Sequence, residues 1–133
     1  MTYQDSGETK YPTAVQAAAG NYQKALFLKS KRQYSEAIDY LRLAIKLNPW
    51  DMNYPIEIAY CYLHLKQPRE ALDILAPLYK KNPQDSNILK PYCYALLELG
   101  RLFEVNNLLE SSAPLIEKDI VLQQLKEKVK SLI

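Results

Sequence analysis

The side chains best suited to chemistry in this sequence are one histidine, His64, and two cysteines, Cys61 and Cys93. A thiol activated by an imidazole is a nucleophile, and thiolates together with an imidazole can bind zinc. One histidine excludes a histidine-rich metal site, and zinc would require the two cysteines to converge. Both cysteines lie on helix faces that are predicted to pack, where a thiol is inert without an activating environment. We therefore expect His64 to form a partly exposed pair with Glu98 and not a catalytic dyad.

The sequence also lacks the motifs and the charge that several other functions require. It has no glycine-rich phosphate loop, no GxSxG and no HExxH motif, so we expect no enzyme, no metal and no cofactor. A net charge of +2, from 17 basic and 15 acidic residues, argues against nucleic-acid binding, which normally requires a basic stripe. No apolar run approaches the 18 or so residues that cross a bilayer, so no membrane insertion is expected.

Composition predicts one globular domain after a short tail. Hydrophobic residues make up 48% and charged residues 24% of the 133 residues, which is ordinary for a folded domain. Residues 1–11 are polar, lack the layout of a signal peptide, and are expected to form a flexible tail before a single domain at residues 12–133. Two cysteines give no disulfide framework, and a cytoplasmic location is the simplest expectation.

One short phrase occurs twice, as KLNPWDMN at residues 46–53 and KKNPQDSN at residues 80–87. The shared residues are 34 positions apart, and an interval of 20 to 50 residues indicates a repeat architecture. Apolar residues recur at helical spacing before each copy, and each period contains two helices. Asn-Pro ends a helix because the residue before proline disfavours the α region. Asp51 and Asp85, or Ser86 in the second copy, are then placed to cap the next helix.

The spacing resembles that of the tetratricopeptide repeat, whose pattern is W-x2-L-G-x2-Y…A-x3-F…P. In residues 52–85 the pattern positions hold Pro55, Ile58, Ala59, Tyr62, Ala71, Leu75 and Pro83. Residues 18–51 and 86–119 fit less fully; the third copy keeps Gly100 at its turn but has Cys93 in the small-residue position. An apolar stripe beyond Pro114 predicts a capping helix at about 115–132. The expected fold is all-α, a tetratricopeptide-like helical solenoid of three helix-turn-helix repeats plus this C-terminal helix. Pro77 and Pro91 fall inside predicted helices.

The resemblance implies where a partner would bind, because the first helix of each pair lines the concave groove in this family. The matching positions that we assign to partner binding are Tyr22, Leu26, Asn53, Ile56, Tyr60, Leu63, His64, Asn87, Lys90, Tyr94 and Leu97. Three pairs occupy equivalent positions in neighbouring repeats: Tyr60 with Tyr94, Leu63 with Leu97, and His64 with Glu98. Tyrosine contributes a large contact area at low entropic cost, so such a groove suits an apolar or mixed peptide.

One specialisation of the family is disfavoured. Members that grip the acidic tail of heat-shock chaperones use a clamp of lysine, arginine and asparagine side chains. At the matching positions this chain has Tyr22, Leu26, Glu57, Asn87 and Pro91, so no clamp cation remains and Glu57 would repel a carboxylate.

The sequence also resembles, more loosely, the small cytoplasmic chaperones of bacterial type III secretion translocators. Those proteins carry a longer N-terminal helix used for dimerisation, for which only residues 12–19 are available here. The leading hypothesis is a non-catalytic protein-interaction module, such as a secretion chaperone or an assembly adaptor, that binds a peptide or helix of another protein. A homodimer is a further option. The alternative is a constitutive structural subunit that docks through its convex face or terminal helix, and RNA binding is the third and weakest hypothesis.

Overall fold

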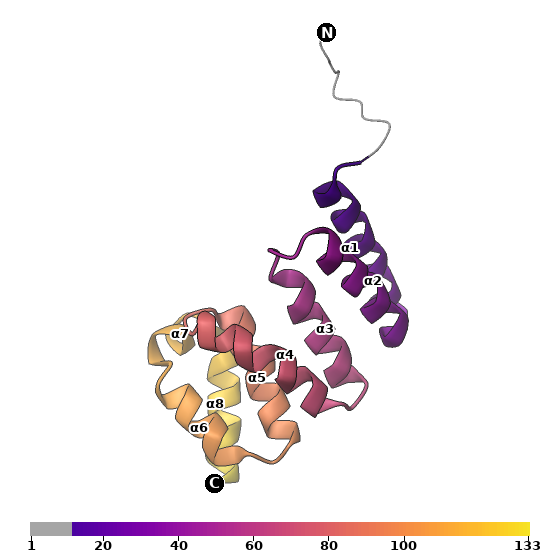
Figure 1. The fold of residues 1–133 in the computed structure, drawn as a ribbon. Coiled ribbons are helices and arrows are strands. Elements are labelled where there is room, and N and C mark those ends of the chain that lie inside the picture. The colour runs from indigo at the N-terminus through magenta and orange to yellow at the C-terminus, as the bar shows by residue number, and fades with distance from the viewer. Residues whose placement is uncertain (1–11) are drawn as a thin grey trace. The chain divides into compact units, whose positions relative to one another are not determined.

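The chain folds into paired α-helices, as the sequence predicts (Figure 1). The computed structural model describes residues 12–133, and these form eight helices and no strand. The three predicted pairs are α1 (Ala14–Ser30) with α2 (Tyr34–Leu47), α3 (Asn53–His64) with α4 (Pro68–Lys81), and α5 (Ser86–Glu98) with α6 (Leu102–Glu110). Within residues 12–133, none of the helices is long and apolar enough to span a bilayer.

The predicted capping helix is two helices rather than one. A short helix, α7 (Ala113–Glu117), precedes α8 (Ile120–Leu132). Between them Asp119 adopts an extended conformation, and its carboxylate accepts hydrogen bonds from the backbone N–H groups of Val121 at 2.9 Å and Leu122 at 3.3 Å. Such a side-chain cap satisfies N–H groups that have no partner inside the helix. The cap thus starts a new helix at residue 120, five residues later than expected.

The first helix begins earlier than the predicted repeat boundary. Thr13 and Gln16 form a capping box, in which each side chain accepts a hydrogen bond from the backbone N–H of the other residue. This arrangement defines a helix start, and α1 then runs without interruption from Ala14 to Ser30. Residues 14–19 are therefore the first turns of a repeat helix and not a separate N-terminal helix.

The two copies of the Asn-Pro-x-Asp phrase form the same junction. The carboxylate of Asp51 accepts a hydrogen bond from the N–H of Asn53 at 2.9 Å, and Asp85 accepts one from Asn87 at 2.9 Å. Before each proline the asparagine leaves the helical conformation, with ψ of 80° at Asn48 and 64° at Asn82. The predicted aspartate caps are confirmed, and in the second copy the cap is Asp85 and not Ser86.

The turn inside each helix pair also recurs every 34 residues. Arg32, Lys66 and Gly100 have φ values of 62°, 62° and 73°, in the left-handed region that favours glycine. The next residue in each case donates its N–H to the carbonyl five positions earlier, from Gln33 to Leu28, from Gln67 to Tyr62 and from Arg101 to Leu96. This is the hydrogen bond of a Schellman motif, which ends a helix with its last carbonyls satisfied.

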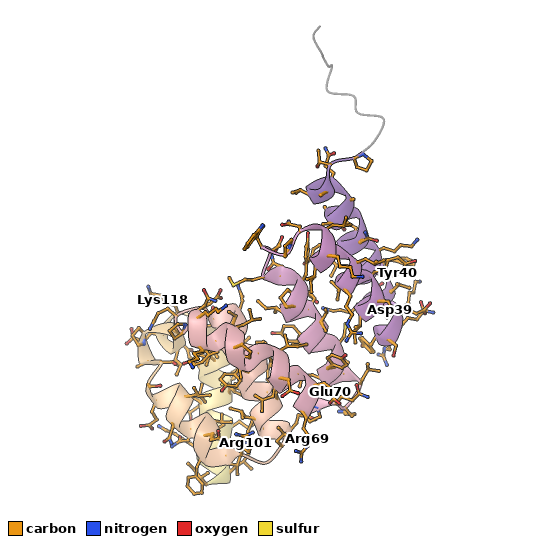
Figure 2. All side chains as sticks on the ribbon, in the orientation of Figure 1. Asp39, Tyr40, Arg69, Glu70, Arg101 and Lys118 are labelled. Carbon is orange, nitrogen blue, oxygen red and sulfur yellow. The ribbon has the colours of Figure 1, made fainter. Side chains whose placement is uncertain are left out.

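The chain comprises two compact units, and the first ends at Tyr54. In this unit α1 packs on α2 through small buried side chains, among them Ala18, Ala25 and Ala37. Small residues let two helices approach closely. The ammonium group of Lys24 lies 5.0 Å from the ring centre of Tyr40 on α2 (labelled in Figure 2), so a cation–π contact joins the two helices.

The second unit, Pro55–Ile133, is organised around α5. Two clusters of buried side chains meet there. One cluster contains Ile56, Ala59, Ala71, Leu75, Ile88 and Ala95. The other contains Leu89, Cys93, Leu96, Val105, Leu109, Ile116, Leu122, Leu125 and Val129. Because α5 contributes residues to both clusters, it is buried on two sides.

Pro77 and Pro91 lie inside α4 and α5 as predicted. Residues 1–11 lie outside the described residues, and the division into a tail and one repeat domain stays a prediction.

Two glycines give a test of this backbone geometry because their substitutions should have opposite signs. Neither Gly20, inside α1, nor Gly100 has any atom within 4 Å of the place where a Cβ would lie. Gly100→Ala should lower the free energy of unfolding by about 1 kcal/mol, since an alanine is strained at positive φ. Gly20→Ala should raise it by roughly 0.5 to 1 kcal/mol, since alanine favours a helix interior. Urea unfolding followed by circular dichroism measures both changes, and equal signs would contradict the assigned turn.

Candidate functional site

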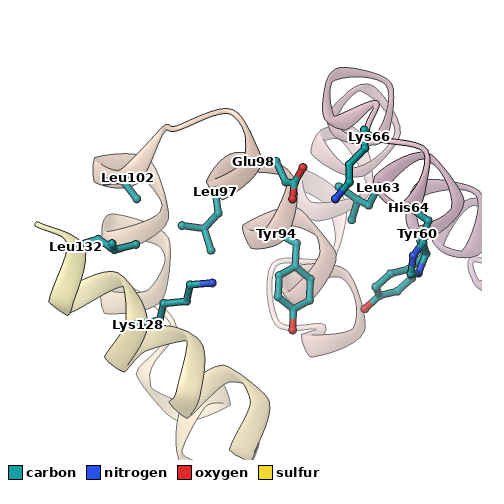
Figure 3. A pocket seen from close by; sticks show the side chains of 10 residues that line it. All are labelled: Tyr60, Leu63, His64, Lys66, Tyr94, Leu97, Glu98, Leu102, Lys128 and Leu132. Atoms are coloured by element: carbon teal, nitrogen blue, oxygen red, sulfur yellow. The ribbon is translucent and has the colours of Figure 1, made fainter.

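A groove of about 550 Å³ opens on the second unit (Figure 3). Helices α3, α5 and α8 supply most of its lining, and the turn after α3 and the start of α6 complete it. The lining residues are Tyr60, Leu63, His64, Lys66, Tyr94, Leu97, Glu98, Leu102, Lys128 and Leu132. We call this site the Tyr60–Tyr94 groove. Its volume is typical of sites that hold a small ligand or a few side chains of a partner.

Five of the eleven residues that we assigned to partner binding line this groove: Tyr60, Leu63, His64, Tyr94 and Leu97. The three pairs that the 34-residue spacing placed in equivalent positions all line this same groove, including His64 and Glu98. Side chains of α3 and α5 therefore lie beside one another, as expected of neighbouring repeats. That these residues bind a partner stays a prediction.

Three other assigned residues of the second unit lie outside the groove lining. Ile56 is only 7% exposed and belongs to a core cluster. The ammonium group of Lys90 lies 2.7 Å from the carboxylate of Asp119 and joins α5 to the start of α8. Asn87 is exposed at the start of α5, where its N–H is capped by Asp85. Asn87 is thus exposed and Lys90 is partly buried in its ion pair, whereas Ile56 packs inside the unit.

The remaining three assigned residues belong to the first unit. The Tyr22 ring packs against the Tyr54 ring with centres 5.2 Å apart. Leu26 is half-buried on α1, and Asn53 is exposed at the start of α3. Their assignment to partner binding rests on the family resemblance alone and stays a prediction.

Four lining residues were missed by the sequence analysis: Lys66, Leu102, Lys128 and Leu132. Leu132 falls at helical spacing on the apolar stripe of the predicted capping helix, yet it is 53% exposed. Leu122, Leu125 and Val129 of the same stripe are buried, so the stripe turns away from the core at its last residue. The position of α8 beside α5 depends on tertiary packing, and the repeat pattern contains no signal for it.

Burial and nearby charges hold Tyr60 in its neutral form. They raise the pKa of its hydroxyl to about 12, through burial first and then through Tyr94, Glu57 and Asp119. Asp119 itself has a pKa below the usual range, chiefly because its carboxylate accepts a hydrogen bond from Lys90. At neutral pH the groove therefore offers a protonated phenol, which can donate or accept a hydrogen bond, on a largely apolar surface.

The cysteines contribute nothing to this site. Cys61 and Cys93 are both fully buried, as the packing pattern predicted. Burial also raises the pKa of the Cys93 thiol to about 12, so the reactive thiolate is scarce at neutral pH. No grouping of three or more His, Cys, Asp or Glu side chains that could hold a metal occurs within residues 12–133.

Comparison with known proteins gives one family and several similar folds. Residues 28–90 match the family model of the tetratricopeptide repeat. No curated protein sequence matches the chain. The tetratricopeptide domain of Arabidopsis OM64 is 17% identical, with a TM-score of 0.80 over 90% of this chain and 99% of that one. The first such domain of Spaghetti (RPAP3), bound to the HSP90 peptide SRMEEVD, is 19% identical, with a TM-score of 0.79 over 90% and 95% of the two chains.

A third similar structure is a bacterial chaperone. The type III secretion translocator chaperone SycD of Yersinia enterocolitica is 16% identical, with a TM-score of 0.75 over 86% of this chain and 92% of that one. At these identities the likeness establishes the fold, and it confirms the predicted all-α architecture of helix pairs followed by a C-terminal helix.

The raised pKa of Tyr60 predicts how stability depends on alkaline pH. In the unfolded chain this phenol loses its proton near pH 10, whereas in the folded chain it does so near pH 12. Its contribution is therefore complete below pH 10 and is lost as the pH rises from 10 to 12. Tyr60→Phe removes the titrating group, so its free energy of unfolding should fall less steeply over this range than that of the wild type. Urea unfolding at several pH values measures both slopes, and identical slopes would contradict the buried position of Tyr60.

Proposed function

We propose that this chain, whose residues 28–90 belong to the tetratricopeptide repeat family, is a non-catalytic module that binds a peptide or helix of another protein. The proposed binding site is the Tyr60–Tyr94 groove. The observation that carries the proposal is the convergence there of two tyrosines and four leucines that are not fully buried: Tyr60, Leu63, Tyr94 and Leu97 pack against the core on one side and line the groove on the other, and Leu132 is exposed. An accessible apolar hollow with a few polar groups is the usual form of a binding site.

The composition of the groove favours a polypeptide. Tyr60 and Tyr94 provide broad rings whose hydroxyl groups can pair with peptide backbone. Leu63, Leu97 and Leu132 offer apolar surface for side chains of the partner. The cavity has no cluster of cations suited to a phosphate backbone, because its charges are Lys66 and Lys128 with the opposing Glu98. RNA binding therefore remains the weakest of the three hypotheses.

The partner is expected to differ from the heat-shock peptides bound by similar domains. Those peptides are SRMEEVD in one structure and SGPTIEEVD in another, and both carry two glutamates near an aspartate. At the clamp positions implied by the family, this chain has Glu57 on α3 and Pro91, which is buried in α5. Repulsion from Glu57 and the missing cations support the proposal that such tails are not its ligands.

A secretion chaperone or assembly adaptor in the cytoplasm is the more specific form of the proposal. The likeness to SycD supports it at the level of the fold.

The alternative is a constitutive subunit of a larger complex. Exposed apolar side chains of the C-terminal segment outside the groove, Ile120 and Ile133, favour that reading. A constitutive subunit purified alone should aggregate into large assemblies through such surface, whereas a groove-binding chaperone should stay soluble.

The double substitution Tyr60→Ala with Tyr94→Ala tests the proposed groove. It should weaken the binding of a partner purified from the native host at least tenfold, while helical content stays nearly unchanged and the loss of two partly buried rings lowers the melting temperature by only several degrees. The matched control is Phe103→Ala, which removes an aromatic ring that is 75% exposed outside the groove, and it should bind normally. Partners are identified by co-purification and mass spectrometry, and affinities by titration calorimetry. Unaltered affinity in the double variant would rule out the groove, and unfolding would place both rings in the core.

A further inference from the structure

The exposed side of α2 in the first unit carries apolar residues that its own packing does not use. Leu43 is 46% exposed and Leu47 is 37% exposed, and Trp50, three residues beyond Leu47, is 87% exposed. Asp39 and Lys46 are exposed on the same helix (Asp39 is labelled in Figure 2). Positions 39, 43 and 46 follow at intervals of four and three, so they lie on one side of the helix. We call Asp39, Leu43, Lys46, Leu47 and Trp50 the α2 face.

The internal repeat shows that the fold does not need these apolar side chains. Thirty-four residues later, the positions of Leu43, Leu47 and Trp50 are occupied by Pro77, Lys81 and Gln84, and all three are also exposed. The two junctions nevertheless have the same aspartate cap at the same distance of 2.9 Å. Glutamine thus suffices in the turn where the first copy has tryptophan. An exposed tryptophan beside exposed leucines is characteristic of an interface, since tryptophan is enriched among the residues that dominate binding energy.

The charged residues on the α2 face are complementary to those on the same face of a second copy of the chain. The acidic residue, Asp39, lies four residues before Leu43, and the basic residue, Lys46, lies three residues after it. Neither makes an ion pair or a side-chain hydrogen bond with another residue in the part of the chain that the structure describes. When two such helices run antiparallel with Leu43 at the centre, each Asp39 comes beside the Lys46 of the other copy. A two-fold axis makes both contacts equivalent, as a closed dimer requires.

We propose that two copies of this chain pair through the α2 face, with antiparallel α2 helices and Leu43 against Leu43. In that register, Leu47 lies opposite position 39 of the other copy, and Trp50 lies opposite position 36, at the start of the other α2. The two Leu43 side chains provide the apolar centre, Leu47 and Trp50 lie beside Asp39 and Glu36 of the other copy, and the two Asp39–Lys46 pairs set the orientation. This interface lies wholly within the first unit, and it is independent of the proposed function of the Tyr60–Tyr94 groove.

A concentration series in the analytical ultracentrifuge tests the proposal. The wild-type chain should pass from monomer to dimer across the micromolar range, because one 14-residue helix per copy forms a small interface. Trp50→Gln, which installs the residue used by the second copy, should weaken the dimer at least tenfold without loss of helical content. The matched control is Phe103→Gln, an equally drastic change at an exposed ring in the second unit, and it should leave the dimer unchanged.

Charge exchange tests the orientation. Asp39→Lys and Lys46→Asp should each weaken self-association, because each places like charges together. A mixture of the two variants should form a mixed dimer as stable as the wild type, since every lysine then meets an aspartate. The double variant in one chain should also regain self-association. Three results would overturn the proposal: a monomer at every concentration, a Trp50→Gln dimer as stable as the wild type, or no recovery in the mixture. A face reserved for a different protein predicts the first of these.

Discussion

Two backbone turns that recur every 34 residues constrain everything else in this protein. One is the left-handed turn inside a helix pair, at Arg32, Lys66 and Gly100. The other is the aspartate-capped junction between pairs, at Asp51 and Asp85. Both turns satisfy the hydrogen-bonding groups of the backbone at the helix ends. Both also fix which residues of the next helix face in a given direction. Residues 34 positions apart on α3 and α5 therefore reach equivalent places, which is why Tyr60 and Tyr94 face the same groove.

The repeated turn costs conformational free energy at the two turn residues that are not glycine. Arg32 and Lys66 adopt a positive φ that costs a side-chain-bearing residue of the order of 1 kcal/mol. The hydrogen bonds of the Schellman turn and the packing of buried Ala59 and Ala71 between α3 and α4 offset that cost. Lys66 also lines the groove. The second unit then closes on α8, which covers the core cluster of α5 and α6 and adds Lys128 and Leu132 to the groove.

The sequence predicted the parts of the structure that depend on local rules. Helix pairs, junction caps and the burial of Cys61 and Cys93 follow from periodicity, from the Asn-Pro-x-Asp phrase and from small-residue positions. The predictions were less complete for the features of the structure that tertiary packing determines. The break at Asp119 follows a local capping rule that the apolar stripe did not reveal, whereas the groove side of α8 depends on how α8 meets α5, through contacts such as the Lys90–Asp119 pair. Ile56 was assigned to the binding surface by its repeat position, yet it lies in a core cluster. One face of a helix contributes residues both to a groove and to the core beside it. Repeat position alone therefore does not distinguish groove residues from core residues.

We propose above all that the Tyr60–Tyr94 groove holds another polypeptide. The most direct measurement is site-specific photo-crosslinking in the native host, with a photoreactive phenylalanine analogue placed at position 94 or, for comparison, at the exposed position 103. If the groove holds another polypeptide, a discrete crosslinked partner should form from position 94 and none of that mass from position 103. Crosslinks from position 103 alone, or the same products from both positions, would contradict it.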